Sequence, residues 1–306
     1  MNMRASSVIL SALLVLTAVL TPSCQLFQGG EELGEEPEVT LYLTEQQETV
    51  TLKFEEYLYG VVAAEMSPGW PLDALAAQAI LARTFAWRKL QTGGEQDNYG
   101  TDVSDDVKSF QAYNADEVND RVVEAVETTR GQIVTYQGEP ALTWFHAASG
   151  GITCDPEEGL EYPDEKPYIP SVAEPEGAEL RPWRASFSES EIITALDELG
   201  YSFDGIEEFI VGARGPSGRA IRFSINGIAV PAASFRVTLD PRALKSTLIK
   251  SIDVGEDGSV SFGGRGFGHG VGMSQEGARV LAERGRSSTD IVNYYYRDVS
   301  IEKIWE

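Results

Sequence analysis

Hydrophobic positions near the start of the chain first alternate with polar ones and then follow a helical period. The alternation over 39–43 and again over 50–54 predicts two half-buried strands. A helix is predicted over about 55–66 and a second one over 71–90, which starts at a proline that a helix start tolerates. Alanine fills so much of this second segment that close-packed neighbours are expected around it, as around a helix at the centre of a domain.

The rest of the chain contains short periodic segments separated by turns. Strands are expected at 131–137, 141–147, 221–227, 234–240 and 299–305. Helices are expected at 188–200, which has a serine N-cap and a closing glycine, at 274–285 and at 288–297. Strands joined by hairpin-like turns, with helices attached, predict an α+β fold with short, mostly antiparallel strands rather than a doubly wound sheet.

One position in the first predicted helix breaks its apolar face. Leu58, Val61 and Val62 share that face, and the next position along it is Glu65, just before a Pro-Gly turn. A frayed helix end with the Glu65 carboxylate in water is the simplest explanation. The alternative is that Glu65 lies there because its carboxyl group takes part in the protein's chemical function.

The first residues resemble an export signal. Arg4 precedes an apolar stretch at 8–20 that is too short to act as a stop-transfer helix, as in a secretory signal peptide. The sequence "TPSC" that follows resembles a bacterial lipobox and predicts a lipid anchor on Cys24; plain cleavage and a disulfide at Cys24 are the alternatives. We therefore expect an exported protein of the cell envelope, attached to a membrane through this anchor.

Three regions are predicted along the chain. Residues 1–24 form the signal peptide, 25–38 an acidic, disordered tether without hydrophobic period, and 39–306 one folded domain. Apart from Cys24 the chain has one cysteine, Cys154, so the fold has to be held by its hydrophobic core.

Net charge narrows the classes of partner. The chain has 48 acidic residues against 24 Lys and Arg, a formal net charge of −24, and its basic residues are thinly scattered. Nucleic-acid binders need a basic surface that neutralises phosphates. We therefore expect no nucleic-acid partner.

Both histidines of the chain lie among small residues. His146 stands in "FHAASGGITC", eight residues before Cys154, but a zinc site takes three or four ligands, so no metal is expected. His269 stands where glycines alternate with larger residues over 264–273. If extended, this segment would carry His269 on one face and bare backbone on the other, where a ligand or another backbone can approach.

Several long segments resemble the stage II sporulation protein D family (SpoIID/LytB). The strongest are "EEYLYGVVAAEMSPGWPLDALAAQAILARTFA" (55–86) and "GRGFGHGVGMSQEGA" (264–278), and the segments 129–151 and 218–247 follow the family order between them. The resemblance covers nearly everything from Val39 to the C-terminus. It implies a SpoIID-like domain with the alanine-rich helix at its centre.

The resemblance implies peptidoglycan glycan strands as the partner. The family includes lytic transglycosylases, which cut strands stripped of stem peptides and leave 1,6-anhydro ends, and proteins described as amidase enhancers. Glu65, in "AAEM", matches the family's catalytic glutamate. Loss of hydration on an apolar helix face raises the pKa of a carboxyl group and keeps it protonated near neutrality, as a general acid must be. We expect a lytic transglycosylase without a cofactor; the alternative is a non-catalytic, wall-binding activator of an N-acetylmuramoyl-L-alanine amidase.

The same segments supply candidate substrate-binding residues. Gln78 and Arg83 are polar residues on the alanine-rich helix, but their spacing of five prevents them from sharing one narrow face, which leaves a structural role open for one of them. The other candidates are Gln111 and Tyr113, which are expected to line a sugar groove, and His146, Ser149, His269 and Gln275, which are donors in glycine-rich surroundings. His269 is expected to face the groove rather than the core. Some family members bind zinc near the "HAASGGITC" segment through a fuller set of His and Cys ligands. This chain has only His146 and Cys154 there, which puts metal binding by this chain in doubt.

Overall fold

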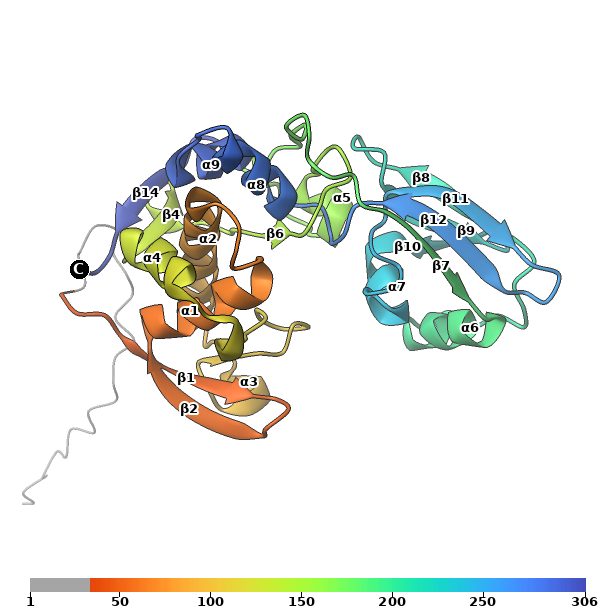
Figure 1. Cartoon of the computed structure of the whole chain (residues 1–306). Coiled ribbons are helices and arrows are strands. Elements are labelled where there is room, and N and C mark those ends of the chain that lie inside the picture. The colour runs from red at the N-terminus through yellow and green to blue at the C-terminus, as the bar shows by residue number, and fades with distance from the viewer. Residues whose placement is uncertain (1–33) are drawn as a thin grey trace, which may run out of the picture. The chain divides into compact units, whose positions relative to one another are not determined.

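The computed structural model of the protein describes residues 34–306 (Figure 1). The predicted signal peptide, the predicted lipid anchor at Cys24 and most of the predicted tether lie outside the described residues. Within residues 34–306 there is no helix with the length and apolar character needed to cross a membrane. The ordered contacts begin slightly before the predicted domain start, because Glu36 accepts a hydrogen bond from the Glu55 N–H (2.7 Å) and pairs with Arg130.

Helices and short strands alternate along the described chain (Figure 1). The helices are α1 (Phe54–Glu65), α2 (Leu72–Leu90), α3 (Gln96–Tyr99), α4 (Asp120–Thr128), α5 (Pro156–Leu160), α6 (Glu189–Glu198), α7 (Ala232–Leu239), α8 (Gln275–Glu283) and α9 (Ser288–Tyr295), with a 3-10 turn at Ala115–Glu117. The strands are β1 (Glu38–Leu43), β2 (Glu48–Lys53), β3 (Val103–Ser104), β4 (Gln132–Tyr136), β5 (Glu139–Pro140), β6 (Phe145–His146), β7 (Pro182–Phe187), β8 (Phe209–Arg214), β9 (Ala220–Ile225), β10 (Ile228–Pro231), β11 (Ile249–Val254), β12 (Val260–Arg265), β13 (Met273–Ser274) and β14 (Ser300–Lys303).

The strands pair into small sheets that are mostly antiparallel. Their orders are β2-β1-β3, β10-β9-β8, β11-β12-β7, β14-β4-β5 and β13-β6. Among the named strands of residues 34–306, parallel pairing is confined to β1 with β3 and β6 with β13, and an isolated parallel bridge joins Cys154 and Val271. The predicted α+β fold is therefore confirmed.

The alanine-rich helix α2 is central to the elements around it. It packs against α1, α4, α8, α9 and β4, and its residues from Ala74 to Thr84 are all buried. Alanine side chains let these neighbours approach the helix axis closely. The packing that was expected from the sequence is confirmed.

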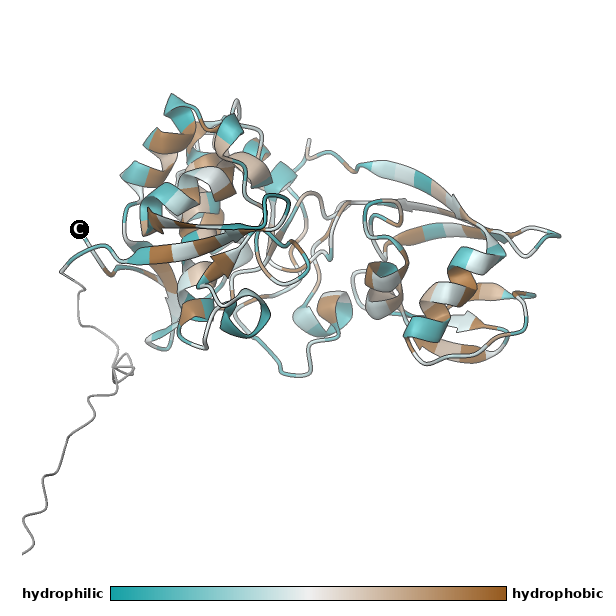
Figure 2. Ribbon diagram, turned by 90° about the horizontal axis from the view of Figure 1, so that it is seen from below, coloured by the Kyte–Doolittle hydropathy of each residue, from teal (hydrophilic) through white to brown (hydrophobic). Residues whose placement is uncertain are grey.

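Residues 182–265 contain a hydrophobic core of their own. Aromatic rings fill much of it, with Phe209 against Phe223, Phe235 and Phe262 at centroid distances of 5.1 to 5.5 Å. Helices α6 and α7 lie beside the strands of this region in Figure 1, and Figure 2 shows both hydrophobic and hydrophilic turns along its helices. Amphipathic helices that cover strands with their apolar faces explain this core.

One predicted strand is wrong and another is much shorter than predicted. Residues 234–240 form most of α7, because Phe235 packs in the core against Phe209 and Phe223 and this packing outweighs the local strand preference. The strand predicted at 141–147 is reduced to Phe145–His146, which within residues 34–306 pairs with Met273–Ser274 alone.

The glycine-rich segment is also not a strand between Arg265 and Met273. Gly266, Gly268, Gly270 and Gly272 have φ between 70° and 108°, a region that favours glycine. The space beside these glycines is taken by the protein itself: a Cβ on Gly270 would lie 2.5 Å from the guanidinium of Arg219. The extended strand is therefore wrong. Of the two expected neighbours, a ligand or another backbone, the second is present, since a Cβ on Gly272 would lie 2.0 Å from the Trp144 carbonyl oxygen.

Candidate functional site

Glu65 is the last residue of α1 and lies on its apolar face. Tyr57, Leu58, Val61 and Val62 are fully buried, whereas Glu65 keeps part of its surface in solvent. The helix stops because the next residue, Met66, has an extended backbone (φ −129°, ψ 150°). The carboxyl group therefore stands at the point where a buried helix face reaches the protein surface.

Two donors contact the Glu65 carboxyl group, one at each oxygen. The backbone N–H of Ala112 donates to Oε1 (3.2 Å), and the side-chain amide of Gln275 donates to Oε2 (3.4 Å). Burial raises the pKa of Glu65 from 4.5 to about 7, against the lowering effect of these two hydrogen bonds. The raised pKa that was expected from the sequence is present, so both protonation states are populated at neutral pH.

Gln78 and Gln275 meet beside this carboxyl group. Gln275 is the first residue of α8, and its Nε2 also donates to Oε1 of Gln78, which is fully buried on α2 (3.3 Å). The Nε2 of Gln78 has no hydrogen-bond partner within residues 34–306. Three helices, α1, α2 and α8, thus bring their polar side chains to one point.

Gln111 and Tyr113 precede and follow Ala112 in the chain, and both pack against α1. The hydroxyl of Tyr57 donates to Oε1 of Gln111 (3.3 Å), and the Tyr57 and Tyr113 rings lie parallel with centroids 6.0 Å apart. Gly60 makes room for this contact, since a Cβ there would lie 2.2 Å from the Tyr113 ring. The spacing of Tyr57 eight residues before Glu65, two steps of four along one helix face, is the sequence signal that would have identified it.

Ala112 and Tyr113 also line a cleft of about 580 Å³. The remaining lining residues come from the tip of the β1–β2 hairpin (43–46), from 105–107 and 114–116, and from Arg242. Four of them are carboxylates: Glu45, Asp105, Asp106 and Asp116. We call this the acidic cleft; it begins at the loop that donates a hydrogen bond to Glu65.

The contacts of Arg83 are those of a structural residue. Its guanidinium is fully buried and pairs with the Glu55 carboxylate (Nη2 to Oε2, 2.6 Å). Its remaining hydrogen bonds go to the carbonyl oxygens of Gln132 and Val126. No donor of Arg83 faces the acidic cleft, so of the pair Gln78 and Arg83 it is the structural member.

His146 and His269 form a pair of their own. Their rings lie 5.5 Å apart; Nδ1 of His146 donates to the Val271 carbonyl (3.1 Å), and Nδ1 of His269 accepts from the Val271 N–H (3.0 Å). Burial lowers the pKa of both, that of His269 to about 3, so both imidazoles are neutral at pH 7. Within the described residues neither histidine is hydrogen-bonded to Glu65.

Ser149 belongs to the same neighbourhood. Its Oγ accepts from the Gly151 N–H (3.1 Å), and its carbonyl oxygen accepts from the buried Arg219 (2.6 Å). Arg219 also donates to the Ile152 carbonyl (2.8 Å). This arginine, which no motif in the sequence marks as a site residue, connects the loop after β6 to the 182–265 region.

The residues near His146 do not fit a zinc ion. Burial raises the pKa of the Cys154 thiol to about 12, and its Sγ contacts the His269 carbonyl oxygen (3.5 Å). Within residues 34–306 no cluster of three or more His, Cys, Asp or Glu side chains could hold a metal. A structural zinc site takes three or four such ligands, so no step of the chemistry below uses a metal.

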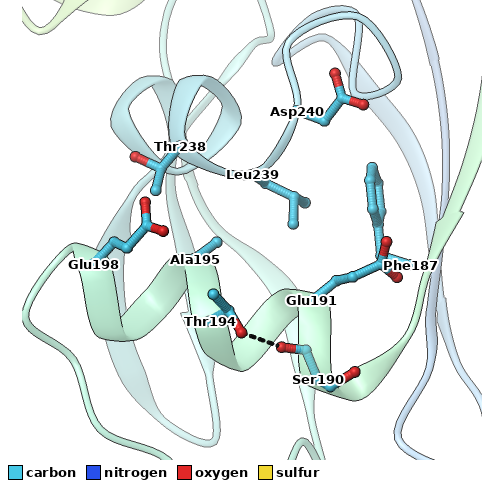
Figure 3. Close-up of a pocket in the computed structure, with 9 residues that line it drawn as sticks. All are labelled: Phe187, Ser190, Glu191, Thr194, Ala195, Glu198, Thr238, Leu239 and Asp240. Carbon is cyan, nitrogen blue, oxygen red and sulfur yellow. Dashed lines mark hydrogen bonds between the residues drawn. The ribbon is translucent and has the colours of Figure 1, made fainter.

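A second hollow, of about 340 Å³, lies between α6 and α7 (Figure 3). Glu191, Glu198 and Asp240 contribute carboxylates to it, and Glu191 already accepts hydrogen bonds from Ser188. Its lining includes none of the residues around Glu65. We place the candidate site at Glu65, where a carboxyl group with a shifted pKa adjoins a cleft.

Comparison with known proteins agrees with the family that the motifs around Glu65 resemble. A family model described as stage II sporulation protein matches residues 42–136, which include Glu65, and a domain of unknown function (DUF8618) matches 171–272. An uncharacterised protein of Brachyspira hyodysenteriae is 35% identical over 256 residues, 82% of this chain and 67% of that protein.

Two proteins of Bacillus subtilis with descriptive names are similar as well. One, named amidase enhancer, is 27% identical over 292 residues, 78% of this chain and 39% of that protein. The other, named stage II sporulation protein D, is 30% identical over 304 residues, 94% of this chain and 85% of that protein. Because that similarity extends over most of both chains and the family model matches the segment around Glu65, the chain belongs to the stage II sporulation protein D family.

Proposed function

We propose that this protein is a peptidoglycan lytic transglycosylase. It would cleave the bond between C1 of N-acetylmuramic acid and O4 of N-acetylglucosamine and leave 1,6-anhydro ends. The observation that carries the proposal is the carboxyl group of Glu65, whose pKa of about 7 lets it both give and recover a proton at neutral pH. Ala112, whose N–H contacts this carboxyl group, lines a cleft of about 580 Å³, a volume typical of ligand sites.

One carboxyl group suffices for this reaction. Protonated Glu65 donates its proton to the bridging oxygen as the C1–O4 bond breaks. The resulting carboxylate then takes the proton from the muramyl 6-hydroxyl as O6 bonds to C1, so no water is consumed and Glu65 ends protonated. The Ala112 N–H and the Gln275 amide hydrogen-bond to the carboxylate in between, which keeps the carboxylate form accessible.

The charge of the acidic cleft favours strands without stem peptides. Glu45, Asp105, Asp106 and Asp116 line it, and like charges brought together at an interface weaken binding. A stem peptide carries more than one free carboxylate, whereas its removal leaves a single carboxylate, on the lactyl group of each N-acetylmuramic acid. We therefore propose glycan strands without stem peptides as the substrate.

The experiment that tests the proposal is a digest of stripped glycan strands with the purified protein, followed by mass spectrometry. We expect 1,6-anhydro ends. Reducing ends without the anhydro ring would show hydrolysis and contradict the mechanism. The similarity to a protein named amidase enhancer supports a second candidate, a non-catalytic activator of an N-acetylmuramoyl-L-alanine amidase; uncut strands together with a faster amidase would favour it.

A location in the cell envelope, with a lipid anchor on Cys24, belongs to the same proposal. We expect Cys24→Ser to move the protein from the membrane fraction to the soluble fraction, because the acyl chains would be lost. Cys154→Ser, which changes a buried thiol far along the chain, should leave the distribution unchanged. Mass spectrometry that finds Cys24 unmodified in the mature protein would rule the anchor out.

A further inference from the structure

Two residues one turn apart on α8 contact Glu65 and Trp70. Gln275 donates to Oε2 of Glu65, and the guanidinium carbon of Arg279 lies 5.8 Å from the centroid of the Trp70 ring. Residues four apart share one face of a helix and lie about 6 Å apart along its axis. Glu65 and Trp70 therefore both adjoin the same face of α8.

The turn that carries Trp70 is fixed in place. It starts at Ser67, two residues after Glu65, and the Trp70 N–H closes it by donating to the Ser67 carbonyl (3.0 Å). From the start of α4, Arg121 donates to the carbonyls of Gly69 (3.1 Å) and Trp70 (3.2 Å). A ligand that meets this turn would not have to order it first, which lowers the entropic cost of binding.

Arg279 supports the indole ring rather than offering a free positive charge. Its Nε contacts the Glu276 carboxylate (3.1 Å) and its Nη1 the Glu283 carboxylate (2.6 Å), so its charge is balanced. A guanidinium at this distance from an aromatic ring is attracted to the ring's electrons. Trp70 still keeps part of its surface in solvent.

We propose that Trp70 forms a sugar-binding subsite next to Glu65, with the indole ring packed against the face of an uncharged pyranose such as an N-acetylhexosamine. The inference rests on the proposed function. The C–H groups on one face of a pyranose carry slight positive charge and pack well on the electron-rich face of an aromatic ring. Tryptophan offers the largest such face among the side chains.

The subsite and the acidic cleft adjoin different oxygens of the Glu65 carboxyl group. Ala112, which lines the cleft, donates to Oε1, whereas Gln275, whose helix carries Arg279, donates to Oε2. A strand that passes the carboxyl group would then contact both the cleft and Trp70. Binding at Trp70 would therefore help to fix which bond meets Glu65.

Binding can be measured without turnover in the full chain that carries Glu65→Gln. Titration with stripped glycan oligomers, followed by calorimetry, should show that the added Trp70→Ala raises Kd about tenfold or more, which is about 1.4 kcal/mol. Trp70→Phe, which keeps an aromatic face, should restore most of the affinity. Trp144→Phe, at a partly buried tryptophan outside the site, should leave Kd unchanged.

The outcomes separate the subsite from the proposed function. If the Glu65→Gln chain binds glycan and Trp70→Ala binds it equally well, the subsite is wrong and the proposed function stands. If the wild-type protein forms no anhydro ends and binds no glycan, both are wrong. Should Trp70→Ala fail to fold, Trp70→Leu, which keeps apolar bulk without a ring, is expected to show the same loss of affinity, and unchanged affinity there would overturn the subsite.

Discussion

Glu65→Gln should lower the rate of 1,6-anhydro end formation by about 10²–10⁴-fold or more, because an amide cannot donate a proton to the bridging oxygen. The loss is expected at the upper end of this range, since one residue acts as both acid and base. Glycan affinity should change little, because the amide keeps most contacts of the carboxyl group. The measurement compares initial rates by mass spectrometry, and Glu124→Gln on the exposed face of α4 serves as the matched control.

The same substitution should change how stability depends on pH. Burial raises the pKa of Glu65 from 4.5 to about 7 in the folded protein, so folding favours the protonated form. The stabilising contribution of this proton is complete below about pH 4.5 and is lost as the pH rises through 7. A glutamine has no such dependence, so the variant should gain melting temperature relative to the wild type as the pH rises from 4.5 to 7.

Three results would contradict the role of Glu65. Near wild-type formation of anhydro ends by Glu65→Gln would mean that another residue supplies the proton. An equal stimulation of an amidase by both proteins, with strands left intact by both, would favour the activator function. Equal melting temperatures of the two proteins at every pH from 4.5 to 8 would show that the carboxyl group is not desolvated.

The helices of this fold could be predicted because their signals are local. Ser188, Ser274 and Ser287 each accept a hydrogen bond from a backbone N–H two or three residues into the helix that follows, which is the pattern that a sequence reveals at a helix start. The apolar face of α1 was equally visible, and with it the unusual position of Glu65. These features depend on residues within a few positions of one another.

The surroundings of Glu65 could be predicted only in part. Gln275 matched a family motif, but the donor at Oε1 is the backbone N–H of Ala112, which has no side-chain signature in a sequence. The acidic cleft assembles from loops that are far apart in the chain. The alternating glycines were visible as a pattern. They are needed because their φ angles are positive and because Arg219 approaches Gly270 closely, and Arg219 is about 50 positions away in the chain.

The environment of the charged residue Arg83 could not be predicted from the sequence either. Its partner Glu55 lies 28 positions earlier, and the pair is fully enclosed, with exposed fractions of 0% and 1%. The Glu55 carboxylate also accepts from the Gly131 N–H (2.9 Å) and from the indole N–H of Trp305 (2.8 Å). One carboxylate thus joins α1, α2, the start of β4 and the C-terminal end of the chain.

Arg83→Met should therefore destabilise the protein by about 3–5 kcal/mol, because it leaves the Glu55 carboxylate buried without its countercharge. Urea unfolding at pH 7 measures the loss, and Glu56→Gln at the exposed neighbouring position should stay within about 0.5 kcal/mol of the wild type. The double variant Glu55→Gln with Arg83→Met should recover part of the stability, since removing both charges of a buried pair is far less harmful than removing one. If Arg83 bound the glycan instead, Arg83→Met would spare the urea midpoint and weaken glycan binding, and that result would return Arg83 to the substrate-binding residues beside Gln78.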